Sequence, residues 1–114
     1  MAVPVAVTVG DDVGDAFVEK IGKEIAGMNV GPGVDAGSDM GPLVTKPHLD
    51  KVRGYVDLGI EEGAELVVDG RDLVIEGNEN GYFLGACLFD KVTPEMKIYQ
   101  DEIFGPVLVV VRVN

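Results

Sequence analysis

The strongest structural signal in the chain lies in residues 102–113, which read Glu-Ile-Phe-Gly-Pro-Val-Leu-Val-Val-Val-Arg-Val. Gly105-Pro106 is a pair typical of a bend, and the residues that follow it are apolar at consecutive positions instead of alternate ones. A strand with that pattern is buried on both faces, as in the middle of an α/β sheet. The segment therefore predicts an α/β fold with a buried strand over 107–113.

A second strand is predicted at residues 5–9, where β-branched side chains follow Pro4 and stop before Gly10. A strand near each end of the chain favours a sheet whose other strands and helices lie outside these 114 residues. We therefore expect one unit, residues 1–114, that is a piece of a larger domain truncated at both ends. The length is sufficient for a single hydrophobic core.

Two amphipathic helices are expected between these strands. Residues 13–27 carry one apolar stripe, and residues 46–62 carry another, with Thr45 as the helix cap and Pro47 in the first turn. The stripes consist of Val13, Phe17, Ile21 and Ile25 in the first helix and of Leu49, Val52, Val56 and Ile60 in the second. Residues 29–44 are rich in glycine and predict a long loop between the helices.

The second half of the chain predicts further β-structure. Residues 65–68 and 73–75 flank Asp69-Gly70, a pair that accepts positive φ, and this order favours a hairpin. Residues 82–89 predict another strand. Residues 93–96 have the cap-then-proline order that starts a short helix.

The composition excludes several classes of partner. Nine basic residues against twenty acidic ones give a net charge of −11, which repels nucleic acid and anionic membranes. The single cysteine, Cys87, cannot form an intramolecular disulfide, so a reducing, cytoplasmic setting is expected. No apolar run approaches the roughly 20 residues of a membrane span.

Side chains that carry enzyme chemistry are scarce. His48 and Cys87 are the only histidine and cysteine, so we expect no transition-metal site. Ser38 lacks the spacing of a hydrolase nucleophile, and we interpret it as a turn residue and His48 as an exposed residue of a helix start. Residues 31–37 are interpreted as a glycine-rich connection without the phosphate-loop pattern. Cys87 lies in an apolar run, which predicts a buried side chain instead of a reactive thiolate.

Three acidic pairs are the remaining candidates. We interpret Asp11-Asp12 as a helix cap and Glu61-Glu62 as a solvated helix end. Asp101-Glu102 differs, because it precedes an aromatic residue and the bend at the entrance to the buried strand. Ligands bind at such strand ends in α/β sheets, where a carboxylate can accept hydrogen bonds from vicinal sugar hydroxyls. The residues alone leave open whether this pair binds a ligand or lies on an ordinary surface.

Residues 102–107, Glu-Ile-Phe-Gly-Pro-Val, resemble the same segment of the aldehyde dehydrogenase superfamily. The resemblance covers the whole chain, because further segments resemble landmarks of that catalytic domain in the same order, namely residues 40–43, 62–64, 81–83 and 93–96. Val68-Asp69-Gly70-Arg71, followed by residues 80–83, is more similar to the methylmalonate-semialdehyde dehydrogenase branch, which acylates coenzyme A, than to branches with a Gly-Gly pair.

The resemblance implies a partial three-layer, aldehyde-dehydrogenase-like catalytic domain with a mixed, mostly parallel sheet and flanking helices. It implies that the nucleophilic cysteine immediately precedes Met1, so this chain holds no catalytic residue. Glu102 matches the glutamate that hydrogen-bonds the nicotinamide ribose, and Phe104 matches the aromatic residue beside the nicotinamide ring. Gly105-Pro106 match the bend that shapes the site, whereas Asp101 departs from the glutamate usual there.

The implied activity is NAD-dependent oxidation of malonate or methylmalonate semialdehyde. The cysteine attacks the aldehyde, hydride passes to NAD, and the thioester is transferred to coenzyme A with loss of carbon dioxide. The parent is expected to be a cytoplasmic homo-oligomer with a small aldehyde as substrate, and the 114-residue chain alone is expected to be inactive. Two alternatives stay open: a non-enzymatic acidic binding or oligomerisation module, and an aldehyde dehydrogenase branch without coenzyme A.

Overall fold

The computed structural model describes residues 3–114, so Met1, to which the expected position of the nucleophile refers, lies outside the described residues. The elements, in chain order, are β1 (Val5–Val9), α1 (Asp11–Ala26), α2 (Lys46–Glu61), β2 (Glu65–Val68), β3 (Cys87–Asp90), α3 (Lys97–Gln100) and β4 (Val107–Val113). The predicted strand at 5–9, the strand at 107–113 and the helix at 46–62 are thereby confirmed.

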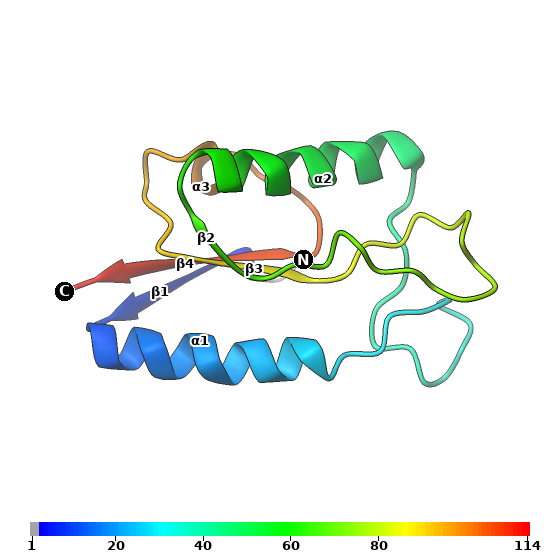
Figure 1. Cartoon of the computed structure of the whole chain (residues 1–114), viewed down its shortest axis with the longest axis horizontal. Coiled ribbons are helices and arrows are strands. Elements are labelled where there is room, and N and C mark those ends of the chain that lie inside the picture. The colour runs from blue at the N-terminus through cyan, green and yellow to red at the C-terminus, as the bar shows by residue number, and fades with distance from the viewer. Residues whose placement is uncertain (1–2) are drawn as a thin grey trace.

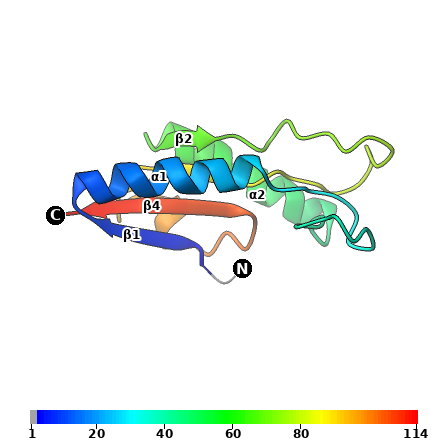
Figure 2. The same ribbon diagram turned by 90° about the horizontal axis from the view of Figure 1, so that it is seen from below.

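The strands form one four-stranded sheet in the order β1-β4-β3-β2. β4 is parallel to both of its neighbours, β1 and β3, whereas β2 is antiparallel to β3. Figure 1 shows α2 and α3 on one side of the sheet and α1 on the other, and Figure 2 shows α1 lying across β4 and β1. The expected α/β fold, with a mixed, mostly parallel sheet between two helical layers, is therefore confirmed.

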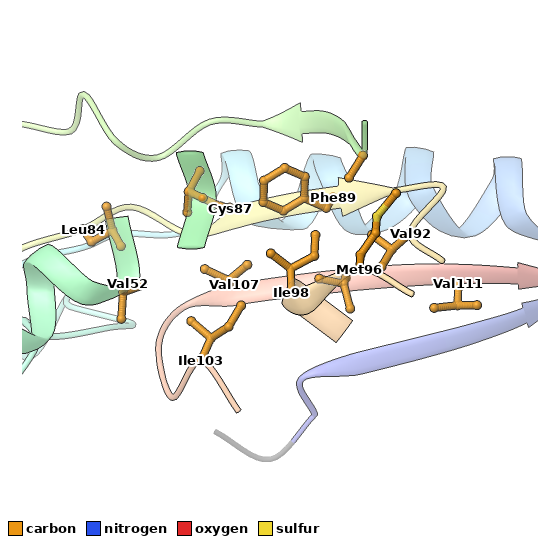
Figure 3. Packing of buried hydrophobic residues seen from close by; sticks show 13 residues of the cluster. Val52, Leu84, Cys87, Phe89, Val92, Met96, Ile98, Ile103, Val107 and Val111 are labelled. Carbon is orange, nitrogen blue, oxygen red and sulfur yellow. The ribbon is translucent and has the colours of Figure 1, made fainter. Parts of the chain in front are cut away.

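β4 is buried on both faces because both helical layers cover it. Its alternate residues Val107, Val109 and Val111 belong to the core cluster beneath α2 and α3 (Figure 3). Val110, which is fully buried, and Arg112 point to the opposite face, where α1 lies. Consecutive apolar residues in the sequence therefore correspond to two separate layers of packing.

The main core fills the space between the sheet and the α2–α3 layer. Gly59 lets α2 lie close to the sheet, because a Cβ atom at this position would lie 2.7 Å from the ring of Phe89 in β3. Figure 3 shows the side chains that converge on this space. The cluster consists of Val52, Val56, Ala64, Leu84, Cys87, Phe89, Val92, Met96, Ile98, Ile103, Val107, Val109 and Val111.

α1 packs less tightly than its apolar stripe predicts. Val13 is 57% exposed, and the other three residues of the stripe are only half-buried. The buried residue of this helix is Gly14, whose missing side chain leaves room for the Arg112 guanidinium, 3.0 Å from an ideal Cβ position. The first turn is therefore held to the sheet by charge more than by apolar contact.

The expected hairpin between residues 65–68 and 73–75 is wrong. β2 pairs with β3, with Leu66 opposite Phe89, and residues 69–86 form an irregular excursion between the two strands. Gly70 begins a turn, in which the Leu73 amide donates to its carbonyl at 3.4 Å, but this turn does not join two paired strands. Gly70 also lies against the backbone of Gly85, where a Cβ atom would come within 2.2 Å. The strand expected at 82–89 is shorter and ends one residue later, since β3 covers Cys87–Asp90. The helix expected to start at 93–96 begins at Lys97, the first residue of α3.

The outer edge of β1 is expected to cause self-association. β1 ends the sheet, and Val7 and Val9 are 58% and 63% exposed, so unpaired backbone groups lie beside apolar side chains. Sedimentation of the isolated 114-residue chain at tens of micromolar should therefore show oligomers. Lysine at both positions should restore the monomer, whereas lysine at Val34, which is 94% exposed in the long loop, should not. A clean monomer that binds no apolar dye contradicts this prediction.

Candidate functional site

The candidate site is built on the segment that joins α3 to β4. Ile103 is 7% exposed and anchors this segment in the core, whereas Glu102 is exposed and Phe104 is 64% exposed. Phe104 has a φ of 61°, in the left-handed region that costs a residue with a side chain about 1 kcal/mol. Such a conformation persists only where the surroundings hold it in place.

Two side chains of α2 hold this segment by hydrogen bonds. Nε2 of His48 lies 2.7 Å from the carbonyl oxygen of Phe104. Two turns further along α2, the Tyr55 hydroxyl donates to Oδ2 of Asp101 at 3.0 Å. This hydrogen bond raises the pKa of Tyr55. The two bonds fix the segment on both sides of Glu102.

The bend at Gly105-Pro106 is fixed by close packing and by the sheet. A Cβ atom at Gly105 would lie 2.6 Å from Cγ1 of Val52, so only glycine lets α2 approach this closely. The Cys87 amide donates to the Pro106 carbonyl at 2.9 Å, and the Val107 amide donates to the Gly105 carbonyl at 2.7 Å. The direction in which the chain enters β4 is thereby determined.

Phe104 separates two hollows. The first, of about 310 Å³, is lined by Pro4 and Val5 at the start of β1 and by residues 98–105. The second, of about 370 Å³, is more apolar and is lined mainly by residues 40–44, with His48 and Phe104 at its side. Residues from both ends of the chain therefore meet at one site.

Both residues singled out in the sequence, Glu102 and Phe104, line the first hollow. An exposed carboxylate can accept hydrogen bonds from hydroxyl groups, and an exposed aromatic ring can lie against a flat group. The arrangement suits a ligand that carries a diol next to a planar ring.

His48 lies in the first turn of a helix, as the sequence predicted, but it is not exposed. The residue is half-buried, and its ring meets the Phe104 ring edge-on, with 6.5 Å between centroids and an interplanar angle of 67°. Sequence reasoning missed this contact. The spacing of His48, Val52 and Tyr55, by four and three residues, places them on one face of a helix and could have predicted that His48 faces the protein, but it does not identify the group that His48 contacts.

The two other acidic pairs differ from their interpretation. Glu62 is not merely solvated, because its carboxylate accepts hydrogen bonds from the amides of Lys97 at 2.7 Å and Ile98 at 3.4 Å, at the start of α3. Asp11 and Asp12 lie in the first turn of α1 and make no cap hydrogen bond there. Their charge still favours this helix end through its dipole.

Asp69-Gly70-Arg71, which resembles a segment of the methylmalonate-semialdehyde dehydrogenase branch, connects residues 69–86 to α2 through ion pairs of Arg71. The Arg71 guanidinium lies 2.7 Å from a carboxylate oxygen of Asp57 and 2.7 Å from one of Asp69. Hydrogen bonding to Arg71 lowers the pKa of Asp69 to about 2. The motif therefore has a structural role in this chain.

Cys87 and Ser38 have the structural roles expected of them. Cys87 is 1% exposed, burial raises the pKa of its thiol, and its sulfur accepts a hydrogen bond from the Gly70 amide at 3.3 Å. The Ser38 amide donates to the Asp35 carbonyl at 3.1 Å in a turn. Within residues 3–114, no cluster of side chains could hold a metal ion. Over the same range, no helix has the length and apolar character needed to cross a membrane.

Comparison with known proteins places the site in context. The model of the aldehyde dehydrogenase family matches residues 4–114. A malonate-semialdehyde dehydrogenase of Pseudomonas aeruginosa is 59% identical over 114 residues, which are 100% of this chain and 23% of that relative. The chain thus spans about a quarter of the length of the relatives it matches.

Two solved structures are similar over almost the whole chain. One, from Sinorhizobium meliloti, is assigned as a methylmalonate-semialdehyde dehydrogenase and was solved with NAD; it is 50% identical, with a TM-score of 0.97 over 99% of this chain and 23% of its own. The other, a methylmalonate-semialdehyde dehydrogenase from Oceanimonas doudoroffii, is 52% identical, with a TM-score of 0.95 over 98% of this chain and 23% of its own.

Proposed function

Because this chain belongs to the aldehyde dehydrogenase family, we propose that it supplies part of the nicotinamide site of an NAD-dependent, coenzyme A-acylating dehydrogenase of malonate or methylmalonate semialdehyde. The observation that carries the proposal is the hollow that Glu102, Phe104 and the start of β1 line together. The names of the relatives support the substrate class, and the NAD complex of one of them supports the cofactor.

The residues of the first hollow fit the nicotinamide half of NAD. The exposed Glu102 carboxylate can accept hydrogen bonds from the two ribose hydroxyls, and the Phe104 ring can limit the position of a flat ring beside it. NAD bound there would supply the hydride acceptor for oxidation of the aldehyde. The part of this chain is to bind and orient, because the bend at Gly105-Pro106 and the contacts from α2 hold both side chains in place.

The nucleophile of the reaction is proposed to come from outside this chain. Cys87 is unsuited to that role, because it is buried and its thiol pKa is raised. The proposal therefore concerns a longer protein, a cytoplasmic homo-oligomer in which this chain is one part of the catalytic domain. The length of the relatives, more than four times that of this chain, supports the greater length of the protein.

Assay of the full-length protein with either semialdehyde tests the proposal. We expect NADH formation that depends on coenzyme A, with acetyl-coenzyme A from malonate semialdehyde, propionyl-coenzyme A from methylmalonate semialdehyde, and carbon dioxide from both. Propionaldehyde, which lacks the carboxylate, serves as the control substrate. Release of a free acid without any need for coenzyme A would instead support the alternative branch, and no oxidation at all would support a non-enzymatic module.

The isolated 114-residue chain is expected to bind NAD weakly and to turn over no aldehyde. One charge-assisted hydrogen bond contributes about 1.5–3 kcal/mol, whereas association costs about 4–15 kcal/mol in lost freedom of motion. Calorimetric titration with NAD and an absorbance assay for NADH measure both quantities. Turnover of an aldehyde by the purified chain would contradict the proposal that the nucleophile lies outside it.

A further inference from the structure

We infer that His48 is a positioning residue that holds Phe104 in its exposed, left-handed conformation. The inference rests on the proposed function, in which Phe104 faces the nicotinamide ring. Because a carbonyl oxygen only accepts hydrogen bonds, the 2.7 Å contact requires that His48 Nε2 carries a proton and donates it to the Phe104 carbonyl. This bond fixes the peptide group that follows Phe104.

Phe104 needs an external restraint because its own packing is slight. Its side chain borders both hollows, and the residue is 64% exposed. Its φ of 61° is unfavourable for any residue with a Cβ atom. The donated hydrogen bond and the edge-on contact with the His48 ring oppose relaxation to an ordinary backbone conformation.

His48 can serve as a fixed donor because its own backbone is held. The residue lies in the first turn of α2, where its amide donates to Oγ1 of Thr45 at 3.2 Å. Pro47 precedes it and restricts the backbone further. One turn later, Val52 is fully buried in the core. The start of α2 thus connects the candidate site rigidly to the hydrophobic core.

The fold itself does not depend on this bond. The bend after Phe104 is held separately, by the close packing of Gly105 on Val52 and by the Cys87 amide on the Pro106 carbonyl. Removal of the imidazole should therefore release the Phe104 side chain while the sheet and helices remain. That separation distinguishes a positioning residue from a core residue.

A fluorescent side chain at position 104 tests the restraint directly. The chain has no tryptophan, so Phe104→Trp introduces a single probe. In that background, His48→Ala and His48→Phe should both lower the fluorescence anisotropy, because each removes the donor, whereas His48→Gln retains an N–H group and should restore it. Asp50→Ala, an exposed change in the same turn, is the control, and circular dichroism checks that each variant is folded.

The affinity of the full-length protein for NADH gives the second readout. His48→Ala should raise the dissociation constant about fivefold, the change expected from loss of one ordinary hydrogen bond, and His48→Gln should recover most of it. Equal anisotropy in all folded variants overturns the inference. Loss of anisotropy in the variants without a donor, with NADH affinity unchanged, upholds the restraint by His48 but contradicts the proposed contact between Phe104 and the cofactor.

Discussion

Replacing Arg112 by leucine is expected to lower the free energy of unfolding by about 3 kcal/mol, because it leaves the buried Asp90 carboxylate without its partner. Asp90 is 3% exposed, and its oxygens lie 2.7 Å and 3.1 Å from guanidinium nitrogens of Arg112. The same guanidinium binds Asp15 of α1 at 2.7 Å. The value lies at the low end for a broken buried pair, because the Lys91 amide still donates to Asp90.

The loss caused by Arg112→Leu should shrink in acid. In the native chain, burial raises the pKa of Asp90, but hydrogen bonding and charge from Arg112 outweigh burial and bring it below the usual 3.8. That contribution is present above the unfolded pKa and is lost as the pH falls through the lower folded pKa. In the variant the contribution of Arg112 is gone and burial is opposed only by the amide and charge of Lys91, so the folded state binds a proton more readily than the native folded state does. Urea unfolding at neutral pH and near pH 4 should show the larger difference at neutral pH.

The exposed pair of Lys23 and Glu19 provides the matched control for Arg112→Leu. Its two side chains are 75% and 68% exposed, so Lys23→Leu should leave the free energy of unfolding nearly unchanged. Similar losses in the two variants, or a loss in Arg112→Leu that does not vary with pH, would contradict the assignment of Asp90 and Arg112 as a buried pair.

The elements that the sequence predicts well are those with a strong local signal. β4 follows from seven consecutive residues whose burial on two faces needs no knowledge of their partners. α2 follows from its Thr45 cap, Pro47 and an apolar repeat, and the cap hydrogen bond forms as expected. In each case the local preference and the final packing agree.

The elements that the sequence mispredicts depend on distant residues. Asp69-Gly70 has hairpin chemistry, but the strand that pairs with β2 is β3, beyond an 18-residue excursion, residues 69–86. The expected stripe of α1 is only half-buried, because the helix start is held by Arg112, about a hundred residues later. Such pairings between remote charges and strands leave no periodicity in the sequence.

The candidate site likewise contains residues that the sequence predicts and contacts that it does not. Glu102 and Phe104 could be proposed from a local segment and its resemblance, and both lie exposed at one hollow. The contacts that hold them come from α2, about fifty residues earlier, and include a hydrogen bond from a side chain to a backbone carbonyl. Because every residue offers a backbone carbonyl, nothing in the sequence could have indicated which carbonyl His48 binds.

Replacing Glu102 by glutamine in the full-length protein is expected to slow hydride transfer by about tenfold or more. The substitution keeps the size of the side chain and removes its charge, so the hydrogen bonds that Glu102 accepts from ribose hydroxyls should weaken. Glu102 is exposed, and its neighbours Ile103 and Asp101 keep their contacts with the core and with Tyr55. The fold should therefore be unaffected.

The pre-steady-state burst of NADH separates a cofactor contact from an ordinary surface carboxylate. Attack of the cysteine on the aldehyde needs no ribose contact, so the thiohemiacetal should still form in Glu102→Gln. The hydride transfer that converts it to the thioester should be slower, so the burst rate falls, and NAD affinity should weaken. Glu95→Gln, an exposed change of the same kind before α3, should alter neither quantity. If burst rate and affinity are both unchanged in Glu102→Gln, the carboxylate does not bind the ribose. The hollow beside Phe104 would then need a different ligand, because the other polar side chains that residues 3–114 place at its edge are those of Asp101, which is bound to Tyr55, and of Tyr99 and Gln100.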